Sequence, residues 1–329
     1  MKPQILVTGG AGFIGSHTCK QLAAAGLMPV TFDNLSTGHR DAVKWGPLVE
    51  GDIRAPEALV ATLRLHQPAA VIHFAASAYV GESVVDPAVY YRNNVEGTRN
   101  LLEACRTTGV RAIIFSSSCA TYGTPDRTPI TEDTPQAPIN PYGRTKLIGE
   151  QMLDDYRSAY GLSFAALRYF NACGADPEGD IGERHTPETH LIPRALMAGA
   201  GLLPFLEVFG TDYPTPDGTC IRDYVHVTDL AQAHVLATQR LLAGGDSLKV
   251  NLGSGKGHSI RQVLDAIAQV IGHPVPAVYR GRRPGDPAEL YADVARARDE
   301  LRFVAQHSDL DTIIRTALPW FSEQVRHAG

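Results

Sequence analysis

The amino-acid sequence predicts an α/β fold: a doubly wound parallel (Rossmann-type) sheet with a smaller, interleaved α/β substrate domain. Three observations predict it. Short apolar runs alternate with helical patterns along the first half of the chain, a glycine cluster follows the first run at once, and the second run ends in Asp33. With 329 residues and 44% hydrophobic content, the chain is long enough for about two domains that share a large core.

The first apolar run, residues 5–8, shows no polar alternation, as expected of a strand buried on both faces of a parallel sheet. Gly9, Gly12 and Gly15 follow it. Their spacing allows a tight turn, close approach of backbone N–H groups to a phosphate, and close packing of a helix on the strand. The helix expected at 13–25 directs the positive end of its dipole at this loop. The pattern therefore indicates a site for a nucleotide pyrophosphate.

The second apolar run, residues 28–32, is followed by Asp33, about twenty residues past the glycines. A carboxylate at that place accepts hydrogen bonds from the adenosine ribose hydroxyls and repels a 2′-phosphate. We therefore expect NAD as the cofactor rather than NADP. Arg40 is close enough in sequence to complicate this preference.

Strands and helices continue to alternate along the chain. We expect strands at 47–50, 70–74, 111–116 and 164–168, and helices at 57–65, 87–107 and 141–160. A doubly wound sheet binds its ligand at the carboxyl ends of its strands. The candidate residues at those ends are Gly9, Asp33, Asp52, Phe74, Ala75 and residues 116–118.

The pattern loosens from Phe170 onward into loops rich in Gly, Pro and Asp, at 175–189 and 211–219, and long ordered loops of this kind often cover a binding site. Helical periodicity returns near 228–242, 259–271 and 309–325. We expect residues 1–169 to form the NAD-binding domain, with 223–253 returning to it. Residues 170–222 and 254–329 should form a second domain that closes over the substrate.

Tyr142 and Lys146 predict a proton-transfer group. Their spacing of four places both side chains on one face of a helix, so the Lys146 ammonium can favour the ionised Tyr142 phenol. Such a neighbour is needed because a phenol with a pKa of about 10 is only about 0.1% ionised at neutral pH. Ser118 can complete the site. A Tyr-x-x-x-Lys pattern alone is more often an exposed helix face, and the glycine-rich loop favours the catalytic interpretation.

Charge, cysteine content and hydropathy limit the partners and the location of the protein. A net charge of −5 without a run of Lys or Arg argues against nucleic acid as a partner. Five cysteines, without C-x-x-C spacing, are typical of reduced thiols in the cytoplasm. No stretch approaches the ~18 apolar residues of a membrane span, so we expect no membrane partner. Because the first strand follows Met1 so closely, we also expect no signal peptide.

His185 and His190 lie in Glu-Arg-His-Thr-Pro-Glu-Thr-His, which offers metal-ligating side chains in a short segment. Their spacing differs from that of a helical zinc motif, and Pro187 interrupts any helix there. We therefore interpret this segment as a polar loop and expect no metal site.

Taken together, the motifs resemble the extended short-chain dehydrogenase/reductase family, most closely its UDP-glucose (UDP-galactose) 4-epimerases, and the resemblance runs from end to end. The motifs that carry it are residues 8–17 (TGGAGFIGSH), 33–38 (DNLSTG), 51–53 (GDI), 73–76 (HFAA), 80–83 (VGES), 93–95 (NNV), 115–118 (FSSS), 122–123 (YG), 141–146 (PYGRTK), 168–171 (RYFN), 215–219 (TPDGT), 222–227 (RDYVHV) and 283–286 (RPGD).

This resemblance implies NAD as a bound cofactor, a UDP-sugar as substrate and a homodimer as the assembly. The residues that it implies for NAD are Gly9, Gly12, Phe13, Ile14, Gly15, Asp33, Asn34, Asp52, Ile53, Phe74, Ala75, Ala76, Asn93, Lys146 and Tyr169. Those that it implies for the substrate are Ser118, Tyr142, Asn171, Leu191, Leu206, Val208, Phe209, Arg222, Arg283, Asp286 and Leu290. Leu206, Val208 and Phe209 would lie near the uracil. Ser118, Tyr142 and Lys146 would be catalytic, in an interconversion of UDP-galactose and UDP-glucose through a transient 4-keto sugar.

Other members of this family, and one unrelated class of protein, are the alternatives. Nucleotide-sugar 4,6-dehydratases carry an Asp-Glu pair where this chain has Cys119 and Ala120, and decarboxylases carry a glutamate at the second position. Neither side chain here supplies an ionisable carboxyl group, which argues against both activities. A non-catalytic NAD-binding sensor would need none of Ser118, Tyr142 and Lys146, so their joint presence argues against it.

Two departures from the family pattern bear on the substrate. Ala78 stands where many such epimerases have a lysine near the cofactor. Leu290 stands at a position resembling the family's size gate, where tyrosine restricts the pocket to plain hexoses and a small residue admits N-acetyl sugars. Because leucine is intermediate, UDP-N-acetylhexosamines and UDP-pentoses remain alternative substrates.

Overall fold

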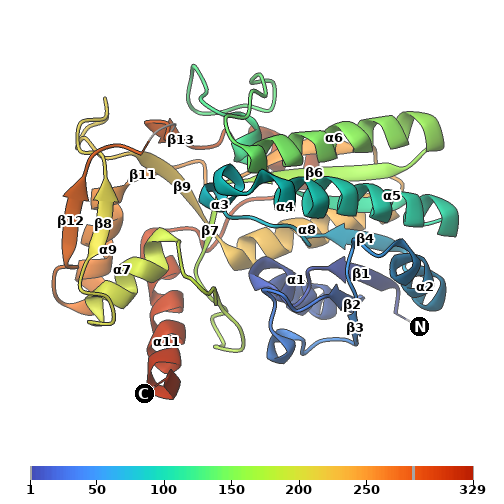
Figure 1. The fold of residues 1–329 in the computed structure, drawn as a ribbon, viewed down its shortest axis with the longest axis horizontal. Coiled ribbons are helices and arrows are strands. Elements are labelled where there is room, and N and C mark those ends of the chain that lie inside the picture. Colours follow the sequence, from blue (N-terminus) through green and yellow to red (C-terminus); the bar gives the residue numbers. More distant parts are fainter. Residues whose placement is uncertain (1, 284–285, 329) are drawn as a thin grey trace.

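The computed structural model describes residues 2–283 and 286–328. It has a larger part built on a parallel sheet and a smaller part made of short strands and helices, which lie side by side (Figure 1). Both parts draw on separated stretches of the chain, because β10 returns to the large sheet after several elements of the smaller part.

The large sheet has seven strands in the order β10-β6-β5-β4-β1-β2-β3, and every neighbouring pair is parallel. Its strands are β1 (Gln4–Thr8), β2 (Met28–Asp33), β3 (Leu48–Glu50), β4 (Ala70–His73), β5 (Ala112–Ser118), β6 (Ser163–Tyr169) and β10 (Leu248–Leu252). The strand order reverses between β1 and β4, which creates a crevice at their carboxyl ends. The predicted doubly wound parallel sheet is confirmed.

Two hydrophobic cores lie on opposite faces of this sheet. Ile5 packs toward Leu22 of α1 and Leu230 of α8, whereas its neighbour Leu6 packs toward Leu59 of α2 and the helices α5 and α6. The helices of this part are α1 (Phe13–Ala24), α2 (Pro56–His66), α3 (Val80–Val85), α4 (Pro87–Tyr90), α5 (Gly97–Thr108), α6 (Pro141–Tyr160), α8 (Val227–Leu242) and α10 (Ala295–Leu301), with short turns η1 (Arg40–Ala42) and η3 (Cys119–Thr121).

The smaller part contains two small sheets and a third core. Strand β9 (Ile221–His226) pairs with β7 (Asn171–Cys173), β11 (Gly257–Ser259) and β13 (Glu289–Leu290), and β8 (Leu206–Phe209) pairs with β12 (Ala277–Arg280). Helices α7 (Leu191–Gly199), α9 (Ile260–Ile271) and α11 (Leu310–Ala328) pack around the core. This arrangement places β7 and β9 next to the carboxyl edge of the large sheet.

One predicted helix is interrupted. The sequence predicts a continuous helix at 87–107, but a π-helical segment, η2 (Tyr91–Glu96), separates α4 from α5. Its central residue Asn94 is 3% exposed and donates to the Ser77 carbonyl at 2.9 Å and to the Thr145 hydroxyl at 3.0 Å. The wider turn therefore directs a polar side chain inward, where it joins the loop after β4 to α6.

The strands and helices that the sequence predicts individually omit α3, α7, α10, β10 and the strands of the smaller part. Among the described residues, no helix combines the length and the apolar character needed to cross a membrane.

Candidate active site

Ser118, Tyr142 and Lys146 come from β5 and α6 at the carboxyl edge of the sheet. Ser118 ends β5 and is 8% exposed, while Tyr142 and Lys146 lie in the first two turns of α6. The helix begins after Asn140, whose side chain accepts a backbone N–H of the first turn at 2.8 Å. This cap fixes the turn that carries Tyr142.

Two glycines allow α6 to approach β5 closely. A Cβ added at Gly143 would lie 2.4 Å from the carbonyl oxygen of Ala120, and one added at Gly149 would lie 2.5 Å from the Phe115 ring. A larger residue at either position would push α6 away from the strand. This close packing of α6 on β5 brings the start of the helix next to Ser118.

Lys146 is buried beside Tyr142. Its ammonium donates to the carbonyl of Ser116 at 2.7 Å and lies 5.8 Å from the centroid of the Tyr142 ring. Burial lowers the pKa of Lys146 to about 7. Burial also raises the pKa of Tyr142 to about 12, and a hydrogen bond with the Ser118 hydroxyl opposes this rise.

These pKa values correct one expectation from the sequence. We expected Lys146 to favour the Tyr142 phenolate, but burial is the largest influence on this phenol, and a pKa of about 12 leaves it protonated at neutral pH. The helical spacing places both side chains on one face, yet spacing carries no information about burial, which sets the sign of the shift.

A buried ion pair that the sequence analysis missed fixes α6 against the sheet. Arg168 of β6 donates to Glu150 at 2.6 Å, and the two side chains are 3% and 0% exposed. Ser117 donates to the same carboxylate at 2.5 Å, and Arg168 donates to the Tyr122 hydroxyl at 2.8 Å. Burial favours the neutral acid, but the Arg168 hydrogen bonds lower the pKa of Glu150. The sequence does indicate that Glu150 shares the inward face of the helix, because it lies eight residues, or about two turns, after Tyr142.

The glycine loop forms the turn between β1 and α1. Gly9 has a φ of +75°, and a Cβ there would lie 2.6 Å from the backbone nitrogen of Ala75. A Cβ at Gly15 would lie 2.1 Å from the Gly9 carbonyl oxygen. Among the described residues, no side chain caps α1 and no acid occupies its first turn, so its N–H groups face the loop without a competing anion. The turn fits the pyrophosphate of a dinucleotide.

Asp33 ends β2 and braces this loop. It is 7% exposed, and its carboxylate accepts the N–H of Ala11 at 3.0 Å and that of Leu35 at 2.8 Å. Burial raises the pKa of Asp33, and these two hydrogen bonds oppose the rise. Beside it, Asn34 donates to Asp52 at 2.9 Å. This group lies where a doubly wound fold places an adenosine ribose.

Arg40, which complicated the preference for NAD, forms an ion pair with Glu50. Both side chains are more than half exposed, at 62% and 58%. The carboxylate that Arg40 contacts is thus Glu50 rather than Asp33.

The other predicted cofactor residues lie along the same edge. The N–H groups of Phe74 and Ala75, directly after β4, both donate to the Thr8 carbonyl, at 2.9 and 3.1 Å. Asn93, in η2, donates to the Ser77 hydroxyl at 3.2 Å. The rest of the set at this edge comprises Gly12, Phe13, Ile14, Ile53, Ala76 and Tyr169.

Asn171, Arg222 and Asp286 form a polar group on the smaller part. Asn171 of β7 donates to the carbonyl of Asp223 on β9 at 2.8 Å. Arg222 of β9 forms an ion pair with Asp286, and their side chains are 11% and 28% exposed. Pro284 and Gly285, in the predicted RPGD motif, lie outside the described residues. Burial raises the pKa of the Cys119 thiol and the charge of Arg222 opposes this rise, so Arg222 lies near the residue that follows Ser118.

Arg283 and Phe209 are stacked, with the guanidinium carbon 3.9 Å from the ring centroid. Phe209 is partly exposed, whereas Leu206 and Val208 are each 2% exposed within the core of the smaller part. Side chains alternate along β8, which turns these two residues away from the surface. Of the three residues predicted near a uracil ring, only Phe209 therefore has a side chain that can face a ligand.

The last two residues of the predicted substrate set are Leu290, on β13, and Leu191, on α7. Leu290 pairs in register with Arg222 through β13 and β9, and it packs against the cluster that contains Tyr122 and Phe170. Leu191 opens α7 and packs partly buried on the core of the smaller part.

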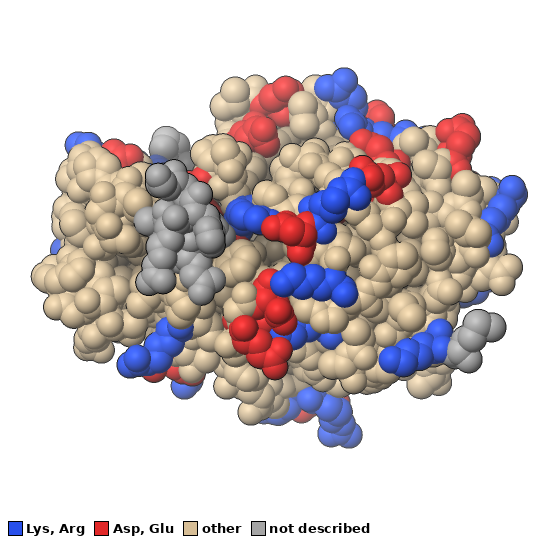
Figure 2. Space-filling model, turned by 90° about the horizontal axis from the view of Figure 1, so that it is seen from below, with Lys and Arg blue, Asp and Glu red and all other residues tan. Residues whose placement is uncertain are grey.

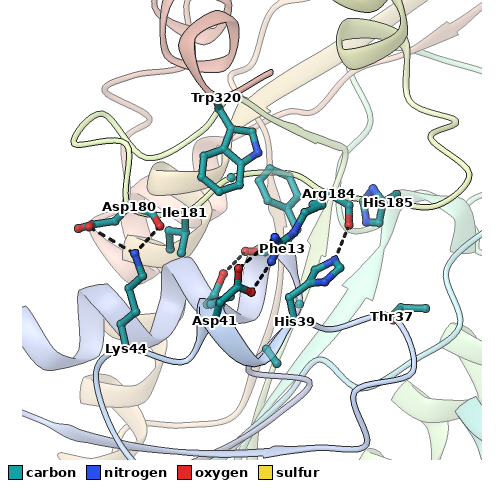
Figure 3. A pocket seen from close by; sticks show the side chains of 15 residues that line it. Phe13, Thr37, His39, Asp41, Lys44, Asp180, Ile181, Arg184, His185 and Trp320 are labelled. Carbon is teal, nitrogen blue, oxygen red and sulfur yellow. Dashed lines mark hydrogen bonds and ion pairs between the residues drawn. The ribbon is translucent and has the colours of Figure 1, made fainter. Parts of the chain in front are cut away.

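A cavity of about 290 Å³ lies beside the glycine loop (Figure 3). The glycine loop contributes Gly12 and Phe13 to its lining, and the chain after residue 175 contributes Ile181, Arg184 and Trp320. Its lining contains none of the three predicted catalytic residues. The cavity therefore belongs to the dinucleotide loop and its cover.

The loop at 175–189 crosses from the smaller part to this cavity. Arg184 donates to Asp41 at 3.0 Å, and Lys44 donates to the carbonyl of Asp180 at 2.7 Å (Figure 3). Both contacts join the loop to the segment after β2.

Acidic and basic side chains intermingle near the middle of the face in Figure 2, so that part of the face carries no patch of a single sign.

Comparisons with known proteins agree with this architecture. A family model described as "NAD dependent epimerase/dehydratase family" matches residues 5–253. The UDP-glucose 4-epimerase of Rhizobium leguminosarum bv. trifolii is 54% identical over 323 residues, which are 98% of each chain. Among solved structures, the UDP-glucose 4-epimerase from Brucella ovis in complex with NAD is 64% identical, with a TM-score of 0.95 over 97% of this chain and 98% of that one. The enzyme from Stenotrophomonas maltophila, with bound NAD and formylated UDP-arabinopyranose, is 40% identical, with a TM-score of 0.96 over 99% of both chains.

Proposed function

The chain belongs to the NAD dependent epimerase/dehydratase family, and from this premise we propose that it interconverts UDP-galactose and UDP-glucose by 4-epimerisation through a transient 4-keto sugar. It is an enzyme that uses NAD as its cofactor. The observation that carries the proposal is the position of Ser118, Tyr142 and Lys146 on the same sheet edge as the glycine loop. One edge thus offers a dinucleotide turn and a proton-transfer group together.

Tyr142 is the group that accepts the proton from the sugar 4-hydroxyl and later returns it, while Ser118 hydrogen-bonds the same oxygen. When bound, NAD supplies the hydride acceptor and, in the return step, the hydride donor. Since the pKa of Tyr142 is about 12, it must fall by several units before the phenol can act as a base, and Lys146 is the cation that α6 places beside it.

The substrate is anchored away from the reacting carbon. Arg222 and Arg283 suit a diphosphate because the guanidinium fork donates two parallel, charge-assisted hydrogen bonds. Asn171 and Asp286 lie beside them for the sugar and its linkage. A firmly held diphosphate leaves the keto sugar free to turn and present its other face.

We place the NAD-binding domain at residues 1–169 with 223–253, and the nucleotide-sugar-binding domain at 170–222 and 254–329. We further propose a cytoplasmic homodimer. Exposed apolar side chains near α5 and α6 support the dimer, namely Val84, Val85, Tyr91 and Tyr160. Sedimentation of the native protein tests it, and a monomer at micromolar concentration would exclude it.

UDP-pentoses and N-acetylated UDP-hexoses remain a second class of substrate. The Stenotrophomonas relative was solved with a formylated UDP-pentose, and Leu290 is smaller than tyrosine. Activity on these sugars would extend the proposed reaction without changing its chemistry.

The decisive experiment incubates the purified protein with UDP-galactose, without added NAD, and assays for UDP-glucose. Product formation is expected because each catalytic cycle regenerates the cofactor. Failure to form UDP-glucose, with or without added NAD, would reject the proposed reaction.

A further inference from the structure

A loop outside the proposed catalytic group brings four metal-ligating side chains together. Glu183, His185, Glu188 and His190 each offer one ligand atom, and these atoms all lie within 4.8 Å of one another. The sequence predicts only a polar loop here, because the spacing differs from that of a helical zinc motif. A turn through Pro187 achieves the convergence without a helix.

Three of the distances within this cluster, Glu183/His185/Glu188/His190, lie close to the ligand separation of a tetrahedral site, and a fourth pair is hydrogen-bonded. His185 Nδ1 lies 3.2 Å from Glu183 Oε1 and 3.5 Å from Glu188 Oε2, and His190 Nδ1 lies 3.6 Å from Glu188 Oε1. His190 Nδ1 also contacts Glu183 Oε1. An ion with tetrahedral bonds of about 2.1 Å holds its ligands about 3.4 Å apart. Small side-chain movements would therefore complete the coordination.

Two polar atoms of the cluster are buried and form ion pairs without a well-aligned hydrogen bond. The Glu188 side chain is only 7% exposed, and its Oε1 accepts the N–H groups of Thr189 and His190 at 2.7 and 2.8 Å. Its Oε2 lies 3.5 Å from the Nδ1 of His185, which lies 3.2 Å from Glu183 Oε1, but neither contact has the geometry of a hydrogen bond. A buried carboxylate oxygen in that state is destabilising, and a cation would remove the penalty.

In a nearby acidic cluster, a lysine side chain already supplies the cation that the carboxylates need. Asp176, Glu178 and Asp180 surround the Lys20 ammonium at 2.7, 2.7 and 3.0 Å. By contrast, within the described part of the chain, the carboxylates of the Glu183 cluster form ion pairs only with its two histidines. Burial lowers the pKa of both histidines, but the two carboxylates raise it by more, that of His185 to about 9, so a metal ion would have to replace the imidazolium protons that balance these carboxylates.

We propose that Glu183, His185, Glu188 and His190 bind one divalent transition-metal ion of the zinc class. Two imidazoles and two carboxylates are ligands that this class accepts in tetrahedral geometry. Because the protein supplies all four ligands, the site is structural rather than catalytic.

The position of the loop explains what such an ion would stabilise. Trp320 of α11 donates to the Glu183 carbonyl at 2.8 Å, and His190 immediately precedes α7. Arg184 and His185 line the cavity beside the glycine loop (Figure 3). The ion would therefore tie α7 and α11 to the wall that closes over the dinucleotide turn.

The test uses untagged native protein with its cofactor. Metal is removed with a chelator, the protein is dialysed, and zinc chloride is titrated in by calorimetry and in thermal unfolding. We expect one zinc per chain and a higher Tm. Glu188→Gln and His185→Gln should each weaken the zinc Kd by about 100-fold or more, since even an outer partner of a metal ligand is commonly worth 10- to 100-fold.

Two matched controls test for adventitious binding. Glu178→Gln changes a carboxylate already paired with Lys20, and His273→Gln changes an exposed histidine elsewhere. Both should retain the stoichiometry and affinity of the parent. No binding at one zinc per chain, or equal binding by the parent and the two cluster variants, would overturn the proposal.

A spectroscopic readout keeps the proposal testable if a cluster variant fails to fold. Cobalt added to the stripped parent protein should give the intense visible bands of a four-coordinate ion. The weak spectrum of six-coordinate cobalt would contradict the proposed site. Neither readout depends on the proposed epimerase reaction.

Discussion

At the scale of single residues, the Tyr142 hydroxyl is the atom on which the proposed chemistry depends. Replacing it in Tyr142→Phe removes a group whose local partner is the Ser118 hydroxyl, so the fold and the NAD content should be retained. The kcat on UDP-galactose should fall by ~10²-fold or more, the usual scale for a positioned proton-transfer group. A Tyr142→Phe enzyme with near-parent kcat would assign the base role elsewhere.

Tyr90 offers a matched control for that change. Its ring lies 6.5 Å from that of Tyr142, but its hydroxyl lies within hydrogen-bond distance of two acceptors, the Tyr79 carbonyl at 2.6 Å and the Glu82 carboxylate at 2.7 Å. Tyr90→Phe should therefore lower the Tm while leaving kcat within a few-fold of the parent.

The buried Lys146 predicts a pH-dependent stability. Its pKa is about 7 in the folded protein against the ordinary lysine value of 10.5, so the unfolded chain binds more protons between these values, and stability rises with pH there. Lys146→Met removes this penalty. Its gain over the parent should be greatest at and below pH ~7 and should fall by about 2–3 kcal/mol between about pH 7 and about pH 9. Denaturant unfolding of both proteins, freed of nucleotide, measures the difference. A gain that is independent of pH would show that Lys146 is charged in the folded state throughout.

Leu290 predicts how substrate breadth can be changed. It lies opposite Arg222 in the β13–β9 register and packs toward Tyr122 and Phe170, so its side chain lies between the polar group and the core. Leu290→Ser should raise kcat/KM for UDP-N-acetylgalactosamine relative to UDP-galactose, and Leu290→Tyr should lower it. A clash of ~1–3 kcal/mol corresponds to a change of about 10- to 200-fold in that ratio. An unchanged ratio in all three proteins would make Leu290 a core residue.

Which site residues could be predicted from sequence depends on what local spacing records. Tyr142 and Lys146 share a helix face, and Gly9 and Asp33 follow strands, so their positions follow from periodicity. The burial of Lys146, and with it the sign of the Tyr142 pKa shift, depends on how closely α6 packs on β5. The packing of α6 on β5 is a property of the tertiary structure, and the four-residue spacing of Tyr142 and Lys146 does not reveal it.

At the scale of elements, α6 is held by its buried ion pair. Glu150→Gln leaves the 3% exposed Arg168 without its charge partner, and it should destabilise the protein by about 3–5 kcal/mol. The exposed pair of Asp299 and Arg298 supplies the control, since Asp299→Asn should leave the unfolding midpoint unchanged. Equal effects of the two changes in urea unfolding would mean that the buried pair contributes no more than a surface pair.

The helix at 87–107 illustrates the limit of sequence at this scale. Its apolar spacing predicts one continuous helix, and the π-helical turn at Tyr91–Glu96 keeps most of that pattern. What the pattern does not show is the inward placement of Asn94, whose partners Ser77 and Thr145 belong to other elements. Local periodicity predicts that a helix is present, whereas the π-helical turn depends on contacts with residues far along the chain.

At the scale of the whole molecule, the alternation of strands and helices was sufficient to predict the parallel sheet and its ligand-binding edge. The smaller part was less predictable, because its strands are short and pair across long separations. β7 and β13, for example, reach β9 from residues 171 and 289. Such pairing is set by packing and leaves little periodic signal.

The contact between the two parts predicts how the cofactor is retained. The loop at 175–189 is joined to the segment after β2 by Arg184 and Asp41, so a dinucleotide on the glycine loop should leave only when that cover opens. Purified protein should therefore release about one NAD(H) per chain on acid denaturation. A supernatant without dinucleotide, or with mainly NADP, would contradict the role of Asp33.

Asp41→Asn should speed the loss of NAD during dialysis by about 2- to 5-fold, the scale of one partly exposed ion pair, whereas Asp299→Asn should not. Equal rates of loss in the Asp41→Asn and parent proteins would mean that the loop does not gate release.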